Sequence, residues 1–306
     1  LKLVYHGDDR LYVPVENIDV LSRFGADEGS VTLDKLGGSG WQARKAKVKK
    51  DLMRMADDLM QTAAARQVQH APRLNIDEGL YQDFVARFPY RETDDQLRAI
   101  EDTLNDISSG QPMDRLICGD VGFGKTEAAL RAAYVAAMEG MQVAVIAPTT
   151  LLARQHYYNF LQRFEGTGLN IAQLSRFVTQ SEASKTRQGL RDGSVNIVIG
   201  THALLGKNIE FANLGLLVVD EEQRFGVKQK ERLKALKANV HVLTLTATPI
   251  PRTMQLAMSG VRDMSVIATP PVDRLAIRTF VLAEDPVVVR EALLREHYRG
   301  GQSFYV

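Results

Sequence analysis

The first 24 residues alternate between apolar and polar positions. Residues 1–5 and 11–15 each carry an apolar side chain at every second position, and 6–9 between them reads His-Gly-Asp-Asp. A period of two is typical of a strand with one covered face, and turn-forming residues between two such runs favour a hairpin. The segment therefore predicts a small antiparallel β unit, which is too short to bury much surface alone.

The period becomes helical after a glycine-bearing loop at 25–40. One stripe of this predicted helix carries Trp41, Val48, Leu52, Met55 and Leu59. Recurrence at three and four residues is the pattern of an amphipathic helix, which Ala71-Pro72 brings to an end. Lysine and arginine crowd the first half of this helix, and we interpret them as a solvated face, with a DNA contact as the alternative.

Beyond residue 73, short apolar runs alternate with helical patterns. Strands are predicted at 115–118, 142–147, 169–174, 196–199, 214–219 and 241–245. Several of these runs are almost entirely apolar, as expected when both faces of a parallel sheet are covered. Alternating strands and helices predict a doubly wound α/β domain.

A proline-containing segment at 268–271 reads as a linker. A strand at 279–282, a helix at 286–298 and a strand at 302–306 are predicted after it. This order is typical of the first β-α-β unit of another domain.

Composition places the chain among ordinary globular proteins. Of its 306 residues, 45% are hydrophobic and 25% charged, and the net charge is +1, so a nucleic-acid surface would have to be a local patch. The single cysteine excludes an internal disulfide. No apolar run approaches the roughly 20 residues that span a bilayer, and no signal peptide precedes the first strand, so we expect a cytoplasmic protein, represented here by a fragment, with no membrane partner.

The segment GDVGFGKT at 119–126 fits the phosphate-loop pattern G-x-x-x-x-G-K-[ST]. Its glycines allow backbone N–H groups to turn around a phosphate, and the following helix adds positive potential. Lys125 is placed to reach the outer phosphates and the hydroxyl of Thr126 to ligate Mg²⁺. The chain is therefore predicted to bind a nucleoside triphosphate, ATP.

Two carboxylates follow the apolar run 216–219. Because a buried strand delivers them to the carboxyl edge of the sheet, Asp220 is predicted to hold Mg²⁺ and Glu221 to orient and deprotonate the attacking water. An acidic loop without a function is the alternative. Upstream, Phe88 and Gln96 are placed to stack on an adenine and read its polar edge, although Phe88 beside Pro89 fits a core position equally well.

The loops after several predicted strands carry hydroxyl, imidazole and guanidinium groups. Such groups suit sequence-independent contacts to a polynucleotide backbone, although threonine and proline also form simple turns. The candidate DNA contacts are Thr149, Arg154, Arg176, Thr201, His202 and Thr246.

In chain order, these segments resemble the motor motifs of the superfamily-two DNA helicases and translocases. Phe88, Thr93 and Gln96 resemble the adenine-reading motif, and GDVGFGKT resembles motif I. The other matches are APTTLLARQH (147–156) to motif Ia, GTHALL (200–205) to motif Ib, DEEQRFG (220–226) to motif II and TLTATPIPRT (244–253) to motif III. GDVGFGKT, DEEQRFG and TATPIPRT together are similar to the bacterial transcription-repair coupling factors, and the resemblance extends over essentially the whole chain.

The resemblance implies a RecA-like doubly wound parallel sheet, the phosphate-loop motor lobe, preceded by a small β domain and a long connecting helix. It divides the chain into 1–38, part of an RNA-polymerase-interacting domain; 39–72, a relay helix; 73–268, motor lobe one; and 269–306, a linker and the start of lobe two. It implies that Phe88 and Gln96 bind adenine. The other residues implied to bind the nucleotide are Asp120, Val121, Gly122, Phe123, Gly124, Lys125, Thr126 and Glu127, of which Gly122, Gly124, Lys125 and Thr126 would bind the phosphates and Mg²⁺.

The implied activity is an ATP-dependent translocase on double-stranded DNA in the bacterial cytoplasm. It displaces stalled RNA polymerase and recruits the excision-repair damage-recognition protein through regions outside this chain. The family completes its ATP site with arginines of a second lobe, so we expect this chain to bind nucleotide and to hydrolyse it poorly. A fork-remodelling branch-migration helicase and a non-hydrolysing polymerase-binding adaptor are the alternatives.

Overall fold

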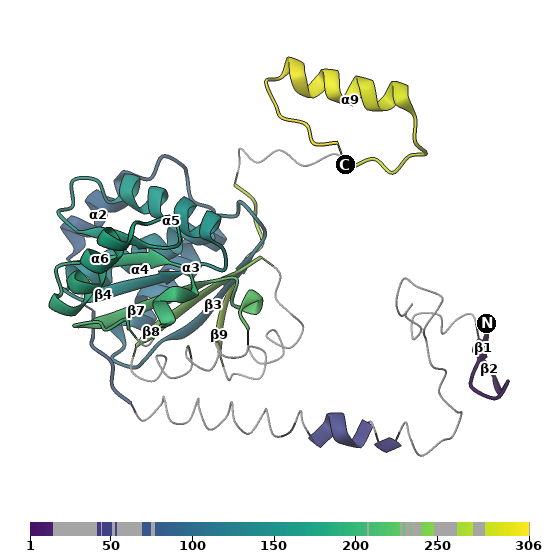
Figure 1. Cartoon of the computed structure of the whole chain (residues 1–306), viewed down its shortest axis with the longest axis horizontal. Helices are drawn as coiled ribbons and strands as arrows, with labels where there is room; N and C mark the ends of the chain where they lie inside the picture. Colours follow the sequence, from purple (N-terminus) through teal and green to yellow (C-terminus); the bar gives the residue numbers. More distant parts are fainter. Residues whose placement is uncertain are drawn as a thin grey trace.

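A parallel sheet of seven strands, in the order β5-β6-β4-β7-β8-β3-β9, forms the centre of the computed structural model (Figure 1). The model describes residues 1–14, 42–43, 45–50, 53, 69–74, 77–206, 208–226, 229, 233, 240–247, 262–271 and 279–305. The strands are β3 (Asp114–Gly119), β4 (Gln142–Ile146), β5 (Ile171–Leu174), β6 (Ile197–Gly200), β7 (Leu214–Asp220), β8 (His241–Thr246) and β9 (Asp263–Ile267).

Helices cover both faces of this sheet (Figure 1). They are α2 (Glu78–Ala86), α3 (Asp94–Ser108), α4 (Lys125–Met138), α5 (Thr150–Arg163) and α6 (Gln180–Asp192), with two short 3₁₀ turns, η2 (His202–Leu205) and η3 (Glu222–Arg224). Threonine hydroxyls cap three of them, because Thr93, Thr149 and Thr179 each accept a backbone N–H of the first turn.

Strands β4 and β7 are buried on both sides, which explains their almost unbroken apolar sequences. In β4, Val143 and Val145 belong to one hydrophobic cluster, whereas Ala144 and Ile146 belong to the cluster on the opposite face. Alternate side chains of a strand point to opposite faces, so a strand covered twice has no polar face. The predicted doubly wound RecA-like parallel sheet is confirmed.

The six predicted strands of the sheet are confirmed, with bounds shifted by a residue or two. Strand β9 was not predicted. It is an edge strand that pairs only with β3 in the described sheet. Its five residues include Asp263 and Ser265, and this mixture gives no clear apolar run.

The N-terminal hairpin is confirmed. Strands β1 (Lys2–Val4) and β2 (Arg10–Tyr12) pair antiparallel, with Leu3 opposite Leu11. The described positions in 42–53 are helical, as the predicted connecting helix requires. Residues 69–72, at the predicted end of that helix, are described and are not helical. The other residues of that helix, including Trp41, the apolar residues at 15–20 and the loop at 25–40 lie outside the described residues.

Helix α9 (Pro286–Tyr298) coincides with the predicted helix, and its N-cap Asp285 accepts the N–H of Val287 at 2.8 Å. The strands predicted at 279–282 and 302–306 were wrong for the described residues 279–282 and 302–305, which form no strand. A strand requires a hydrogen-bonded neighbour, and none pairs with these residues in the described structure. Their apolar side chains are exposed, 94% for Val281 and 88% for Phe304. Among the described residues, no helix combines the length and the apolar character that crossing a membrane requires.

Candidate active site

The predicted phosphate loop connects β3 to α4 at the carboxyl edge of the sheet. Gly122 and Gly124 have φ angles of 80° and 82°, the left-handed region that other residues enter only at a cost. A Cβ built on Gly124 would collide with Nε2 of Gln96, which donates to the carbonyl of Phe123, so a side chain here would have to displace that amide. The two glycines therefore serve the conformation of the loop, and α4 starts directly after it.

Lys125 extends back across the loop. Its Nζ donates to the carbonyl oxygens of Gly119 at 2.6 Å and Asp120 at 2.9 Å. Burial lowers the pKa of Lys125, and the nearby carboxylates of Glu221, Asp220 and Asp120 oppose this effect. The ammonium group thus lies between the phosphate loop and the carboxylates at the end of β7, where phosphate oxygens would be better acceptors than the two carbonyls.

Asp220 is the last residue of β7, and Oδ2 of its carboxylate lies 2.8 Å from Nε2 of His156 on α5. Glu221 follows with a φ of 51°, a strained conformation for a residue with a side chain. Its Oε1 accepts the backbone N–H of Ala247 at 2.8 Å, and its Oε2 accepts a hydrogen bond from Gln223. Both carboxylates are therefore held in place by neighbouring elements.

These groups fit a Mg²⁺ ion. No cluster of three or more histidine, cysteine or carboxylate side chains with metal-binding geometry is found in the described part of the chain. A cation here would be held by one carboxylate, Asp220, by the hydroxyl of Thr126, and by oxygens of ligand and water. Mg²⁺ prefers hard oxygen donors and keeps several waters, so this sparse set suits it.

Gln96 connects the candidate adenine region to the phosphate loop. Its Nε2 donates to the carbonyl of Phe123 at 2.9 Å, and its Oε1 accepts the N–H of Thr93 at 2.9 Å. Phe88 is half-buried and is not a member of either hydrophobic cluster formed by the described residues. The guanidinium of Arg131 lies 5.7 Å from its ring centroid. The structure therefore holds Phe88 next to charged groups and not within the apolar core.

The carboxylate of Glu127 points into a buried ion-pair network. Its Oε1 accepts from Arg131 Nε at 2.8 Å and from Arg163 Nη2 at 2.9 Å, and Arg131 is also paired with Glu92. Glu127 was predicted to bind nucleotide, but this side chain is directed to the arginines, and its backbone N–H already donates to Gly124 at 2.9 Å.

The candidate DNA contacts follow β4, β5 and β6 or, for Thr246, end β8, which places them at the same edge of the sheet as the phosphate loop. Four of them, Thr149, Arg154, Arg176 and His202, are exposed. Thr201 and Thr246 are only 6% and 3% exposed. A polynucleotide cannot reach these two hydroxyls in this conformation, because solvent itself scarcely does.

Sequence reasoning missed two polar residues that the structure brings to the site. His156 lies on the buried stripe of α5 between Ala153 and Phe160, and a histidine in such a stripe is the signal that could have identified it. Asp95, beside Gln96, accepts the N–H groups of Ala268 and Thr269 and the Thr269 hydroxyl at 3.0, 2.9 and 2.6 Å. Helix α3 is thereby attached to the predicted linker, 173 residues away.

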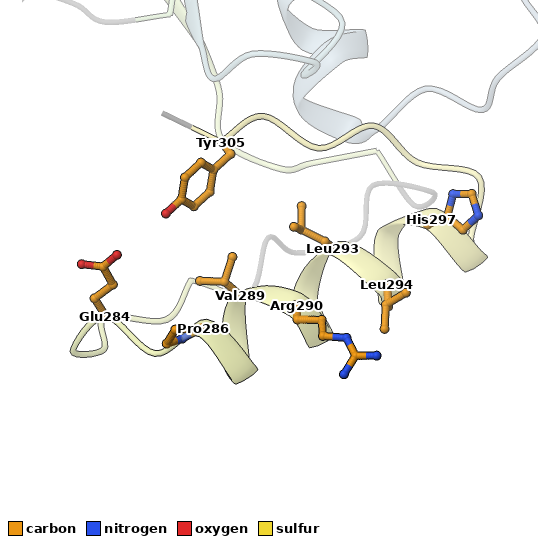
Figure 2. Close-up of a pocket in the computed structure, with 8 residues that line it drawn as sticks. All are labelled: Glu284, Pro286, Val289, Arg290, Leu293, Leu294, His297 and Tyr305. Atoms are coloured by element: carbon orange, nitrogen blue, oxygen red, sulfur yellow. The ribbon is translucent and has the colours of Figure 1, made fainter.

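A hollow of about 530 Å³ lies along α9 and contains none of the residues predicted to bind nucleotide. Val289 and Leu293 point from the helix toward the side on which Tyr305 lies (Figure 2). The complete lining is Glu284, Pro286, Val289, Arg290, Leu293, Leu294, His297 and Tyr305. Half of this lining is apolar and half is polar or charged, and it includes none of the residues of the sheet edge.

Known proteins resemble the chain over its whole length. A family model described as DEAD/DEAH box helicase matches residues 93–257, more than half of the chain. Proteins named transcription-repair-coupling factor from Rickettsia prowazekii and Bacillus subtilis are 52% and 50% identical to it, covering 100% of this chain in each case. The chain spans only 28% and 26% of their lengths.

The solved structure of RecG bound to a three-way DNA junction is also similar. It is 31% identical with a TM-score of 0.69, and the match covers 95% of this chain and 40% of that one. The resemblance inferred from the motifs is therefore confirmed, both in sequence and in fold.

Proposed function

Because the chain belongs to the DEAD/DEAH box helicases, we propose that it is the ATP-hydrolysing motor portion of a double-stranded-DNA translocase of the transcription-repair-coupling type. The observation that carries this proposal is the 52% identity that extends from the N-terminal hairpin through the sheet to α9. A phosphate-loop ATPase alone would match only in its sheet. In the proposed role, the longer protein displaces a stalled RNA polymerase and recruits an excision-repair damage-recognition protein in the bacterial cytoplasm.

The proposed division of the chain follows the same relationship. Residues 1–38 belong to a polymerase-interacting domain, 39–72 to a connecting helix, 73–268 to motor lobe one, and 269–306 to a linker and the start of lobe two. The exposed N-terminal hairpin and the separate helix α9 support this division.

The residues of the sheet edge have distinct proposed roles in hydrolysis. The N–H groups of the loop and Lys125 bind the phosphates, and Phe88 and Gln96 bind the adenine. Thr126 and Asp220 hold Mg²⁺, which neutralises charge on the transferred phosphoryl group. Glu221, whose carboxylate is held by Ala247 and Gln223, orients the attacking water and accepts its proton.

The proposed coupling to DNA passes through the same edge. Gln223 donates to Glu221 and, at 3.1 Å, to the hydroxyl of Thr246 at the end of β8. Thr149 and Arg154 are exposed on the neighbouring helix α5. The proposed DNA contacts are Thr149 and Arg154, whereas Thr246 is buried and would act as an internal connection between the end of β8 and the proposed catalytic base, through Gln223.

A fork-remodelling helicase is the second candidate, and the observation that favours it is the similarity to the RecG structure solved on a three-way DNA junction. The identity to that protein, 31%, is lower than the 52% and 50% to the coupling factors. We therefore favour the coupling role.

The proposed function can be tested by fluorescent-ATP binding and by ATP turnover with and without duplex DNA. Lys125→Ala should weaken nucleotide binding by about 10- to 100-fold, because a charge-assisted hydrogen bond contributes on the order of 1.5–3 kcal/mol. Lys185→Ala, which removes an exposed lysine of α6, is the matched control. Glu221→Gln should bind ATP normally, and in the longer protein, whose second lobe would complete the ATP site, it should lose turnover.

The partners are tested by titration. The proposal requires this chain, or the longer protein that contains it, to bind RNA polymerase. It also requires that a DNA junction is bound no more tightly than plain duplex DNA. Tighter binding to a three-way junction without polymerase binding would favour the fork-remodelling role. Equal nucleotide binding by the wild-type and Lys125→Ala proteins would instead support an adaptor whose phosphate loop is inactive.

A further inference from the structure

His156 occupies a position that an apolar residue would normally fill. On α5 it lies in the buried stripe between Ala153 and Phe160, both 0% exposed, and is itself 7% exposed. A buried polar ring is costly unless it is hydrogen-bonded. Its Nδ1 has no hydrogen-bond partner among the described residues, and its Nε2 faces Asp220. The one interaction shown for this imidazole is therefore with the proposed Mg²⁺ ligand.

The geometry of the pair leaves the carboxylate able to bind a cation. The 2.8 Å contact uses one oxygen of Asp220, Oδ2, and a carboxylate can ligate through the other. The side chains are 9% and 14% exposed, so water competes little for the bond. A hydrogen bond of this kind fixes the rotation of the carboxylate about its last torsion, which is otherwise broad.

Helix α5 brings more than this histidine to the site. Its N-cap Thr149 and the exposed Arg154, two residues before His156, are proposed DNA contacts, and the guanidinium of Arg154 lies 5.6 Å from the ring centroid of Tyr158. The helix therefore has one face at the proposed DNA surface and the other attached to the end of β7.

On the premise of the proposed nucleotide site, we propose that His156 is a positioning residue that orients Asp220 for Mg²⁺ and connects the metal site to helix α5. Residues that hydrogen-bond to metal ligands fix the orientation of those ligands, and their loss typically weakens metal affinity by about 10- to 100-fold. A histidine that only satisfies its own burial would have no such effect on the metal.

The test measures metal binding and not turnover. Mn²⁺, which accepts the same oxygen donors as Mg²⁺, is titrated into the 306-residue protein in the presence of ADP and followed by electron paramagnetic resonance. His156→Leu removes the N–H donor and replaces the imidazole with an apolar side chain of similar length. His156→Gln restores an N–H donor near the position of Nε2. Gln155→Leu introduces the same leucine at an exposed neighbouring position.

We expect His156→Leu to weaken Mn²⁺ binding by about 10- to 100-fold, His156→Gln to remain within about threefold of wild type, and Gln155→Leu to be unchanged. Fluorescent ADP binding in EDTA should stay the same in all four proteins. If His156→Leu does not fold, His156→Asn, whose amide ends short of Asp220, should show the same loss of metal affinity.

A folded His156→Leu or His156→Asn protein with wild-type Mn²⁺ affinity would overturn this inference and leave the proposed function standing. Equal losses in His156→Leu and His156→Gln would also overturn it, because the donor would then be irrelevant. Failure of the wild-type protein to bind Mn²⁺ with ADP would overturn the proposed nucleotide site itself.

Discussion

Glu127 supplies negative charge to two arginines in the interior of the α/β domain. The carboxylate is 6% exposed, and the side chains of Arg131 and Arg163 are 3% and 9% exposed. Arg131 has a second carboxylate partner in Glu92. Arg163 otherwise donates to the carbonyl of Phe84 at 2.6 Å and stacks over its ring at 4.0 Å. Among the described residues, Glu127 is therefore the carboxylate that forms an ion pair with Arg163.

Glu127→Gln would remove this charge while keeping the size of the side chain. Arg131 would then keep Glu92 as its carboxylate partner, and only a neutral amide would remain beside Arg163. Removing one partner of a buried ion pair costs about 3–5 kcal/mol. Because the amide oxygen still accepts one hydrogen bond, we expect the lower end, about 3 kcal/mol. In a domain of this size, that corresponds to a decrease of about 6–12 °C in the melting temperature.

Urea unfolding of the wild-type and Glu127→Gln proteins, followed by circular dichroism, measures the change in free energy of unfolding. The matched control is Glu210→Gln, which breaks the pair with Arg191, where both side chains are about half exposed or more (65% and 49%) and 3.1 Å apart. An exposed pair contributes at most about 1 kcal/mol. A loss below about 1 kcal/mol for Glu127→Gln, or losses of equal size for the two variants, would refute the argument that burial makes this network important.

Two further predictions concern the loop and the linker. Gly124→Ala should cost about 1–2 kcal/mol in left-handed strain and weaken ATP binding at least about tenfold. The control is Gly140→Ala, because Gly140 also has a left-handed φ, 76°, but open space around it. This variant should lose stability to the same strain and keep full ATP affinity. Similar ATP affinities of the two variants would show that the contact between residue 124 and Gln96 does not matter for binding. Hydrogen bonds from Thr269 and Arg98 lower the pKa of Asp95 to about 2, so its contribution to stability is complete above its unfolded value of 3.8 and is lost as the pH falls toward 2. Asp95→Asn should remove that acid-sensitive contribution to stability and speed amide hydrogen exchange at Ala268 and Thr269. Unchanged exchange at these two amides would show that Asp95 does not hold the linker.

The sheet could be predicted because its signals are local. Each central strand is an apolar run, and the position of the loop and of Asp220 follows from the ends of two such runs, in β3 and β7. Strand β9 could not be found in this way, because what makes it a strand is its pairing with β3 and the burial of Ser265, which donates to Asp102 at 2.7 Å and accepts from Arg115 at 2.8 Å. Residues 279–282 show the opposite error: their apolar run predicted a strand, but without a pairing partner among the described residues they form none.

The site shows the same limit. Local motifs predicted Asp220 and Glu221 as site residues, but contacts that hold these two carboxylates come from distant parts of the chain: His156 reaches Asp220 across 64 residues, and Ala247 reaches Glu221 across 26. Nothing in either sequence segment specifies the other. Only the order of strands in the sheet, with β4 and β8 on either side of β7, brings α5 and the end of β8 to the two carboxylates.

Gln96 combines both kinds of information. Its spacing from Thr93 is the local signature of a capping box, which the structure forms at the start of α3. The second bond of the same amide, from Nε2 to the carbonyl of Phe123 across 27 residues, has no signature in either segment. One side chain thus fixes the start of the helix proposed to read adenine and the loop proposed to hold phosphate. A carboxamide that turned toward an adenine would have to give up or share these bonds. The proposed base recognition would therefore be coupled to the conformation of the phosphate loop.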